Sequence, residues 1–293
     1  MNISLTIIGA GRVGKTIARC MHRHEVATIA DVVTRSAQSA HAAVQFIGGG
    51  NALCDVGEVG PANIFMLAVP DDQIESCCIQ LVKSGRLQPH SVVFHCSGAL
   101  SSSILDAART AGAAVASIHP IRSFADPAIV ADQFINTYCG VEGDDAALVI
   151  LSQLFANIGA VMVPIDGNSK TLYHAAAVFA SNYIVSVMSV AQQAFVAAGI
   201  DANAALAMLL PLTRESIENV ARLGPAAALT GPIARGDTQV VARQQAAVMN
   251  WDKDYGVLYQ QLALATQRLA ASRNANSVET AAANHADLND IKR

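Results

Sequence analysis

The 293-residue sequence contains few charged and few aromatic side chains: 14% of its residues are charged and 5% are aromatic. A net charge of −4 leaves no excess of positive charge for binding nucleic acid or an anionic membrane surface. We therefore expect neither nucleic acid nor a membrane among its partners. Hydrophobic residues make up 52% of the chain, and alanine supplies many of them, which predicts closely packed helices and a large core.

None of the six cysteines forms a C-x-x-C pair, and no spacing of Cys, His, Asp and Glu suits a metal ion. The first residues carry neither a positively charged segment nor a cleavage site, so we expect no signal peptide. These features predict free thiols, a cytoplasmic location and no bound metal. The longest apolar run, residues 175–200, is interrupted by polar residues, which favours a core helix over a membrane span.

Short apolar runs alternate with helical stretches through the first half of the chain. The runs that predict strands are residues 5–8, 28–33, 64–69, 92–95, 115–118, 137–141 and 161–163. Such strands indicate a doubly wound, mostly parallel α/β sheet of the Rossmann type. After residue 164 we find only helical patterns, at 169–198, 202–222, 237–249 and 255–271. The sequence therefore predicts a nucleotide-binding domain over residues 1–165 and an all-helical domain over residues 166–293.

A glycine-rich loop joins the first predicted strand to the first predicted helix and reads Gly9-Ala10-Gly11-Arg12-Val13-Gly14. The first glycine permits a tight turn, the second lets the backbone approach a pyrophosphate, and the third lets helix and strand pack closely. The free N–H groups at the start of the helix favour an anion. We expect this whole loop to bind a dinucleotide.

The end of the second strand usually distinguishes NAD from NADP, since an acidic residue there would bind the ribose 2′-hydroxyl. This chain has Thr34, Arg35 and Ser36 at that position, whereas Asp31 comes too early and is expected inside the strand. Arg35 can bind a 2′-phosphate through charge-assisted hydrogen bonds. The residues therefore favour NADP(H) as cofactor, although Arg35 as an ordinary surface arginine is the alternative.

In a doubly wound sheet, ligands bind outside the carboxyl ends of the strands, and three such ends carry suggestive residues. The segment Ala68-Val69-Pro70 would pass the cofactor, and Ser97 could hydrogen-bond the nicotinamide. His119 follows a further strand and could transfer a proton near neutral pH, or could simply hydrogen-bond its own loop. Cys96 follows His95 directly, so their side chains face opposite ways, and a buried thiol is more plausible than a nucleophile.

The helical half offers further polar candidates. Lys170 and His174 are four residues apart and share a helix face, and Asn182 is near the continuation of that face. These groups need polar partners if they are buried, which a ligand would supply, and a solvated helix start is the alternative. Arg235 lies in an irregular Gly-Pro loop and suits a substrate carboxylate, or an internal ion pair with Asp237.

Five segments together resemble one protein family: GAGRVG, HCSGAL, SIHPIRSF, KTLYHAAAVFASN and ALTGPIARGD. The family consists of Rossmann-like bacterial proteins that are usually labelled NADP oxidoreductases and whose C-terminal domain has no assigned function. The resemblance implies a C-terminal domain of the 6-phosphogluconate dehydrogenase C-terminal type, similar to those of pyrroline-5-carboxylate reductase and ketopantoate reductase. Such relatives often dimerise through the helical domain, so we expect a homodimer.

Two related enzyme families imply roles for individual residues. Ketopantoate reductases use a lysine near the start of the long helix together with an asparagine, and Lys170 and Asn182 look similar, although His174 replaces a second expected asparagine. Prephenate dehydrogenases carry a serine after one strand and a catalytic histidine in a His-Pro pair after the next. Ser97 and His119 look similar to that pair. The two likenesses imply different substrates, and fold-level analogy does not choose between them.

We therefore expect an NADPH-dependent oxidoreductase that transfers a hydride to or from a small carboxylate, such as a ketopantoate-like 2-oxo acid. The alternatives are a cyclic imine reductase, a prephenate-type dehydrogenase and, in a different class, a non-catalytic NADPH-binding sensor or regulator. The candidate catalytic residues are Lys170, His119 and His174, and which one donates the proton stays open. The expected substrate-binding residues are Ser97, His119, His174, Asn182 and Arg235.

Overall fold

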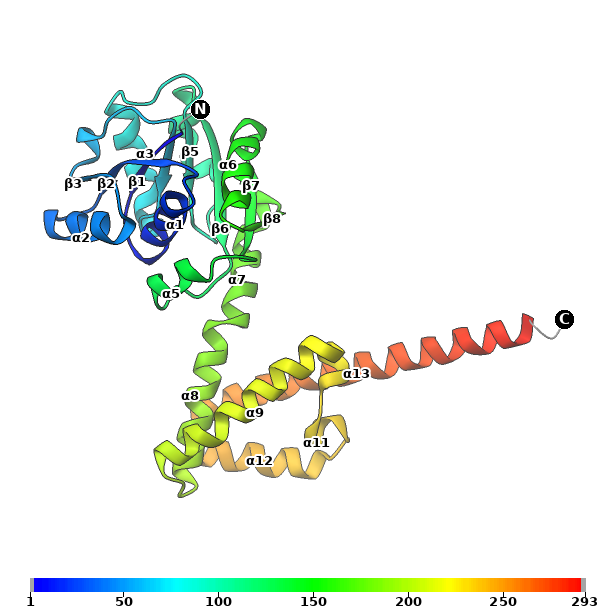
Figure 1. The fold of residues 1–293 in the computed structure, drawn as a ribbon. Helices are drawn as coiled ribbons and strands as arrows, with labels where there is room; N and C mark the ends of the chain where they lie inside the picture. The colour runs from blue at the N-terminus through cyan, green and yellow to red at the C-terminus, as the bar shows by residue number, and fades with distance from the viewer. Residues whose placement is uncertain (1–2, 291–293) are drawn as a thin grey trace. The chain divides into compact units, whose positions relative to one another are not determined.

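An eight-stranded sheet organises the first of the two units into which the chain divides, Met1–Tyr183 and Ile184–Arg293. The computed structural model describes residues 3–290, and side chains of residues 3–273 (Figure 1). The strand order is β3-β2-β1-β4-β5-β6-β7-β8, and β6 and β7 form the antiparallel pair in an otherwise parallel sheet. The strands are β1 (Ser4–Ile8), β2 (Thr28–Val33), β3 (Asn51–Leu53), β4 (Ile64–Leu67), β5 (Val92–His95), β6 (Ala114–Pro120), β7 (Tyr138–Gly143) and β8 (Val161–Pro164). The predicted doubly wound, mostly parallel Rossmann-type sheet is confirmed.

Helices cover both faces of this sheet because successive strand residues point to opposite sides. In β4, for example, Ile64 and Met66 join the core on one face, and Phe65 and Leu67 join the core on the other. The first core contains residues of α1 (Arg12–Arg23), α2 (Ala37–Ile47), α5 (Pro127–Asp132) and α6 (Asp145–Asn157). The second contains residues of α3 (Ile74–Lys83) and α4 (Asp106–Thr110).

Local signals in the sequence define where several of these helices begin and end. The Ser36 hydroxyl caps α2 by accepting a hydrogen bond from the Ser39 N–H at 3.3 Å, and Gly48 ends that helix in the left-handed conformation. Asp126 caps α5 in the same way, and Pro127 occupies its first turn. These caps place the loops that follow β2 and β6 at the carboxyl edge of the sheet.

The helix predicted as one piece over residues 169–198 is two helices, α7 (Lys170–Ala180) and α8 (Asn182–Ala197). The break lies at Ser181, whose φ of −128° and ψ of −75° are not helical. The compact units divide after Tyr183, so α7 belongs with the sheet, whereas the predicted domain boundary at residue 165 coincides with the end of β8.

One helical stretch, residues 167–197, is long and apolar enough to cross a membrane, with a mean hydropathy of 1.4 over its most apolar window. This criterion uses only length and composition, and core helices of globular proteins meet it too. None of that window is buried. The expected core helix is therefore not covered by the rest of the chain.

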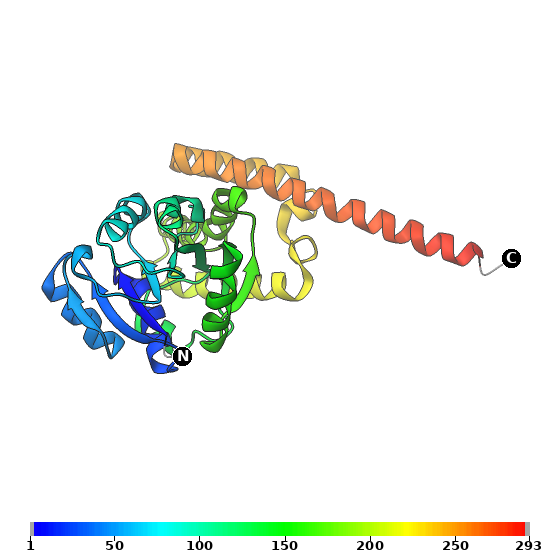
Figure 2. The same cartoon turned by 90° about the horizontal axis from the view of Figure 1, so that it is seen from above.

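The second unit is helical over its described residues, as predicted. Its helices are α8, α9 (Ala202–Leu223), α10 (Pro225–Ala228), α11 (Gly231–Ala234), α12 (Thr238–Trp251) and α13 (Lys253–Asp290). The helices α12 and α13 pack against each other (Figure 2). Among its described side chains, the buried hydrophobic ones are Ala205, Leu209, Val241 and Ala263. So small a core leaves most apolar side chains of α8 and α9 exposed.

Candidate functional site

The three glycines of the loop between β1 and α1 have distinct physical roles. Gly9 has a φ of +92°, and a Cβ built there would lie 2.6 Å from the Ala68 carbonyl oxygen. A Cβ on Gly14 would lie 2.3 Å from the Gly9 carbonyl oxygen. Gly11 instead faces open space, with no atom within 4 Å of a built Cβ. The loop therefore needs Gly9 and Gly14 for its own packing and leaves room for a ligand over Gly11.

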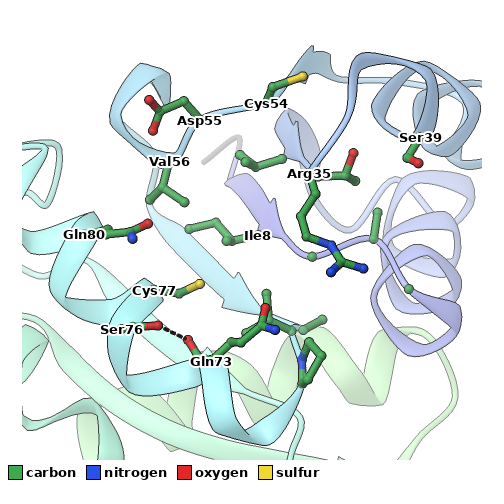
Figure 3. Close-up of a pocket in the computed structure, with 18 residues that line it drawn as sticks. Ile8, Arg35, Ser39, Cys54, Asp55, Val56, Gln73, Ser76, Cys77 and Gln80 are labelled. Carbon is green, nitrogen blue, oxygen red and sulfur yellow. Dashed lines mark hydrogen bonds between the residues drawn. The ribbon is translucent and has the colours of Figure 1, made fainter.

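A cavity of about 620 Å³ opens beside this loop (Figure 3). Of the residues expected to bind a cofactor, Gly9, Ala10, Gly11, Thr34, Arg35, Ala68, Val69 and Pro70 line it. Figure 3 shows the Arg35 side chain extending along the cavity toward the loop. Residues that the sequence did not single out also line it, among them Ser39, Cys54, Asp55, Gln73 and Gln80. Ser39 could have been found, because it lies three residues after the helix-capping Ser36 and shares its side of α2.

Three residues that were expected to bind the cofactor, Arg12, Gly14 and Ser36, do not line the first cavity. Ser36 is the cap of α2, and its hydroxyl donates to Ser39 Oγ at 2.9 Å. Arg12 is the exposed first residue of α1, and Gly14 packs beneath the loop. Of this group, only Gly14 has a role, close packing, that the sequence anticipated.

Asp31 is inside β2, as expected, and its carboxylate is already bound by the protein. It accepts hydrogen bonds from Asn51 Nδ2 at 3.0 Å and from the Gly60 N–H at 2.8 Å, and the residue is 5% exposed. Asp31 is also not among the residues that line the cavity beside the glycine loop. The acidic residue of this strand is therefore a structural brace.

A second cavity, of about 280 Å³, adjoins the first, since Ala68 and Val69 line both. Its walls come from the carboxyl ends of β4, β5 and β6, from the start of α1 and from α7. The lining residues are Val13, Ala68, Val69, Asp71, Cys96, Ser97, Gly98, His119, Pro120, Arg122, Phe124 and His174. The fold thus brings together the expected residues Val13, Ser97, His119 and His174.

His119 lies at the centre of a cluster of rings in this second cavity. Its Nδ1 is 3.0 Å from the Tyr173 hydroxyl, and its ring meets those of Tyr173 and His174 edge to face. Burial, together with the nearby His174 and Lys170, lowers the pKa of His119 to about 4. His119 is therefore neutral at pH 7, so it can polarise a substrate by hydrogen bonding but does not carry a proton ready to donate.

Gly98 lets the two histidines converge. A Cβ built on Gly98 would lie 2.4 Å from His174 Nδ1 and 2.8 Å from His119 Nε2. His174 Nδ1 is buried and has no hydrogen-bond partner among the described residues. An unpartnered buried nitrogen is costly, and it commonly marks a position that a ligand or water completes.

The Ser97 hydroxyl is fully engaged by the protein. It donates to Asp71 Oδ2 at 2.9 Å and accepts from the N–H groups of Ala99 and Leu100 at 3.1 and 3.0 Å. A hydroxyl has one donor and two acceptor sites, so all its capacity is used. Ser97 lines the cavity but shapes the turn after β5, and a nicotinamide would compete with these bonds.

Lys170 is almost completely buried, at 1% exposure, and its ammonium is bound by the sheet. It donates to the Ser97 carbonyl at 2.8 Å and to the Ser117 hydroxyl, and Glu142 Oε1 lies 3.8 Å away. Burial lowers the pKa of Lys170 to about 8, while Glu142 opposes that change. Two hydrogen bonds and one ion pair hold the ammonium in place, so this geometry suits a structural anchor better than a proton donor.

Asn182 and Arg235, the other residues expected to bind the substrate, lie away from His119 and His174 in the sequence. Asn182 is the exposed first residue of α8. Arg235 is exposed in the second unit, so its role as an anchor for a carboxylate stays a prediction. Arg122, within the first unit, does line the second cavity, and its guanidinium is held by the Gln133 carbonyl and by Thr137 Oγ1. A positively charged residue of the site was therefore missed, although it stands three residues after His119.

Burial raises the pKa of the Cys96 thiol to about 12, so this thiol stays protonated at neutral pH. His95 hydrogen-bonds the Ser101 carbonyl and accepts from the Ser97 N–H. Cys96 is half-buried and lines the second cavity, while both ring nitrogens of His95 have other partners, so the two residues do not form a Cys–His pair. In the part of the chain that the structure describes, no three His, Cys, Asp or Glu side chains form a metal-binding group.

Comparison with protein families matches two domain models along the chain. Residues 1–120 match the Rossmann-like domain, and residues 137–266 match DUF2520, a domain of unknown function. No curated protein matches the sequence significantly. The two matches cover the sheet and most of the described helices.

Solved structures with the same fold cover nearly the whole chain. A protein from Thermotoga maritima is 26% identical, with a TM-score of 0.72 over 92% of this chain and 99% of its own. A Bacteroides fragilis protein classed as an NADP oxidoreductase is 19% identical, with a TM-score of 0.74 over 91% of this chain and 98% of its own. A pyrroline carboxylate reductase from Plasmodium falciparum, solved with NADP bound, is 14% identical, with a TM-score of 0.57 over 92% and 98%. These likenesses establish the fold that the chain adopts.

The lowered pKa of His119 predicts how its ring titrates. An unperturbed histidine takes up its proton near pH 6.5, whereas His119 does so near pH 4, so acid favours the unfolded chain between these values. We expect the His119 ring to remain neutral at pH 5.5 and the free energy of unfolding to decrease as pH falls from about 6.5 to about 4. A histidine-ring NMR titration, with the signal assigned by His119→Gln, measures this directly. A midpoint near pH 6.5 would contradict it.

Proposed function

Because the chain joins a Rossmann-like domain to a DUF2520 domain, we propose that it is an NADPH-dependent oxidoreductase acting on a small carboxylate. The observation that carries the proposal is that two cavities lie side by side and share Ala68 and Val69 in their walls. One cavity follows the glycine loop, and the other ends at His119, Arg122 and His174. This is the arrangement that a hydride-transfer enzyme needs, with a dinucleotide site opening onto a polar substrate site.

The residues around the first cavity fit a dinucleotide. A cradle that a Cβ at Gly9 or Gly14 would fill lies beside the N-terminus of α1, and the space over Gly11 is open. Free N–H groups at a helix start suit a pyrophosphate. A structural neighbour from Plasmodium falciparum has NADP bound, and this supports the same class of cofactor here.

NADP is favoured over NAD by the residues at the end of β2. Arg35 lines the cavity with Thr34 and Ser39, which together can bind a 2′-phosphate. The acidic alternative, Asp31, is occupied by Asn51 and Gly60. The cavity wall at this end also contains Asp55, whose carboxylate accepts the Gly57 N–H as a helix cap.

When bound, the cofactor would supply or accept the hydride, and the protein must orient and polarise the substrate. Neutral His119 can donate one hydrogen bond to a substrate oxygen, and the buried His174 Nδ1 offers a second polar contact. Arg122 is held in place by its bonds to Gln133 and Thr137 and can attract a carboxylate. Lys170 stabilises the strand ends that carry these groups. The geometry therefore favours His119 over Lys170 as the group that acts on the substrate.

The finer alternatives lead to different substrates. A 2-oxo acid, a cyclic imine and a prephenate-like alcohol all fit a small polar cavity beside a dinucleotide. A sensor that only binds NADPH needs no such cluster, so His119, Arg122 and His174 favour an enzyme.

The six cysteines are free thiols, which is consistent with the cytoplasmic location that we propose.

We also propose a homodimer, because the second unit cannot bury its own apolar residues. Val185 on α8 is 68% exposed, and Leu212 and Ile217 on α9 are 59% and 52% exposed. Apolar surface of this extent on helices usually contacts another subunit. A second copy is the favoured partner, since most soluble oligomers are symmetric homo-oligomers.

The cofactor proposal predicts that Arg35→Ser weakens NADPH binding about 10- to 100-fold, the worth of a charge-assisted hydrogen bond, and leaves NADH binding unchanged. Gly11→Ala should weaken both cofactors without lowering the melting temperature, because its methyl group would point into the open cavity. Fluorescence titration with both cofactors measures these effects. Equal binding of NADH and NADPH to the wild-type protein would sink the NADP assignment.

The reaction proposal predicts NADPH oxidation with one of a set of 2-oxo acids and cyclic imines, or NADP⁺ reduction with prephenate. His119→Asn should lower kcat about 100-fold, as for loss of a transition-state hydrogen-bond donor. Arg122→Gln should raise KM for the carboxylate substrate about 10-fold or more and reduce the preference for the acid over its amide. If NADPH binds but His119→Asn and Arg122→Gln retain full activity, the substrate site is misplaced, and if no substrate reacts, a sensor is favoured.

The dimer proposal predicts a solution mass of about twice the 30.5 kDa chain mass. Val185→Glu should yield monomers, or shift dissociation to higher concentration, because it places a charge on the covered face. Val149→Glu is the matched control, since Val149 is 72% exposed on α6 of the first unit. Sedimentation of the three proteins tests this. A monomeric wild type, or one that sediments with lipid vesicles, would contradict it.

A further inference from the structure

Tyr173 is a third aromatic residue of the second cavity's cluster, and the proposed reaction leaves it without a role. It lies on the first turn of α7, between the buried Lys170 and His174. Its hydroxyl oxygen is 3.0 Å from His119 Nδ1, and the two rings meet edge to face with centroids 5.6 Å apart. This contact can run in either direction, because a tyrosine hydroxyl and a neutral imidazole can both donate and accept.

Acid–base strength favours one direction, because a phenol is a stronger donor than a neutral imidazole N–H and an imidazole nitrogen is a stronger acceptor than a phenol oxygen. Burial raises the pKa of Tyr173 to about 12, and a hydrogen bond from the Gly140 backbone opposes this rise. A backbone donor beside the hydroxyl oxygen is consistent with that direction. The hydroxyl hydrogen is then free to point at His119 Nδ1. Gly140 permits this approach, since a Cβ built on it would lie 2.3 Å from the Tyr173 hydroxyl oxygen.

His119 lines the second cavity, and its opposite nitrogen lies beside Gly98. A Cβ built on Gly98, which lines the cavity, would lie 2.8 Å from His119 Nε2. In a neutral imidazole one nitrogen carries the hydrogen and the other accepts. If Nδ1 accepts from Tyr173, the hydrogen must lie on Nε2.

We propose that Tyr173 is a positioning residue that holds His119 as the Nε2–H tautomer, so that a fixed hydrogen-bond donor faces the substrate cavity. This rests on the proposed function only for its chemical consequence. A fixed N–H donor binds a carbonyl or alkoxide oxygen and cannot accept a hydrogen bond from the N–H of a protonated imine. The site therefore favours the carbonyl of a small 2-oxo acid over a cyclic imine.

The attachment of α7 to the sheet explains why the Tyr173 hydroxyl stays in contact with His119. Lys170, three residues before Tyr173, is bound to the ends of β5 and β6 through Ser97 and Ser117. One helical turn separates the two side chains, so the buried ammonium also fixes the depth at which the tyrosine ring enters. The position of the Tyr173 hydroxyl relative to His119 is therefore fixed by the attachment of α7 to the sheet.

The test uses the full chain labelled with ¹⁵N in its histidine rings, at pH 7. Long-range ¹H–¹⁵N correlations show which ring nitrogen carries the hydrogen and whether the other accepts a hydrogen bond. We expect the hydrogen of His119 to be on Nε2, and we expect Nδ1 to have the chemical shift of a hydrogen-bonded acceptor. In Tyr173→Phe, and in Gly140→Ala, the Nδ1 resonance should move to that of a free acceptor and the Nδ1–H form should become populated. Tyr138→Phe, which removes an exposed hydroxyl, should change neither.

A wild-type spectrum with Nδ1–H, or a Tyr173→Phe spectrum identical to the wild type, overturns the proposal. If Tyr173→Phe fails to fold, the wild-type spectrum alone decides between the two tautomers. Activity is read separately: Tyr173→Phe should lower kcat for a 2-oxo acid more than it raises KM, and turnover of a cyclic imine in preference to the 2-oxo acid contradicts the substrate class. Absence of any reaction counts against the proposed function and leaves the tautomer result standing.

Discussion

The buried ammonium of Lys170 is the interaction on which the second cavity depends. A charge removed from water is costly unless it is paired, and here the Ser97 carbonyl, the Ser117 hydroxyl and Glu142 surround it. Glu142 is in turn held by the backbone and hydroxyl of Ser102. These bonds join the start of α7 to the ends of β5, β6 and β7, so they determine where the side chains that follow on α7 enter the cavity.

The second constraint is the close packing of backbone and side-chain atoms, which three glycines permit because they have no Cβ. Gly14 lets α1 pack against the glycine loop, Gly98 admits the two histidine rings, and Gly140 admits the tyrosine hydroxyl. A methyl group at any of these positions would lie within 3 Å of a neighbouring atom. Atoms held this close explain how a small cavity of about 280 Å³ can contain several polar groups with defined orientations.

Much of the fold could be predicted because it follows from local patterns. Apolar runs and a glycine loop identified most strands, the mostly parallel sheet and the helical second half. The break at Ser181 was missed, because residues 169–198 carry no proline or glycine and their helical pattern is continuous across it. Among the expected site residues, His119 and His174 line the second cavity, whereas Arg122 and Tyr173 were given no role, although the segments SIHPIRSF and KTLYHAAAVFASN contain them.

By itself, the sequence determined that a dinucleotide loop follows the first strand, that an arginine replaces the acidic residue after the second, and that Lys170 and His174 share a helix. Local chemistry suffices for these, because backbone geometry and residue spacing decide them. Only the tertiary structure decided the surroundings of each group: the Lys170 ammonium is held by the sheet, the Ser97 hydroxyl is saturated by its own turn, and the His119 ring is half-buried and neutral. Burial and long-range partners define those surroundings, and residues far apart in the chain supply both.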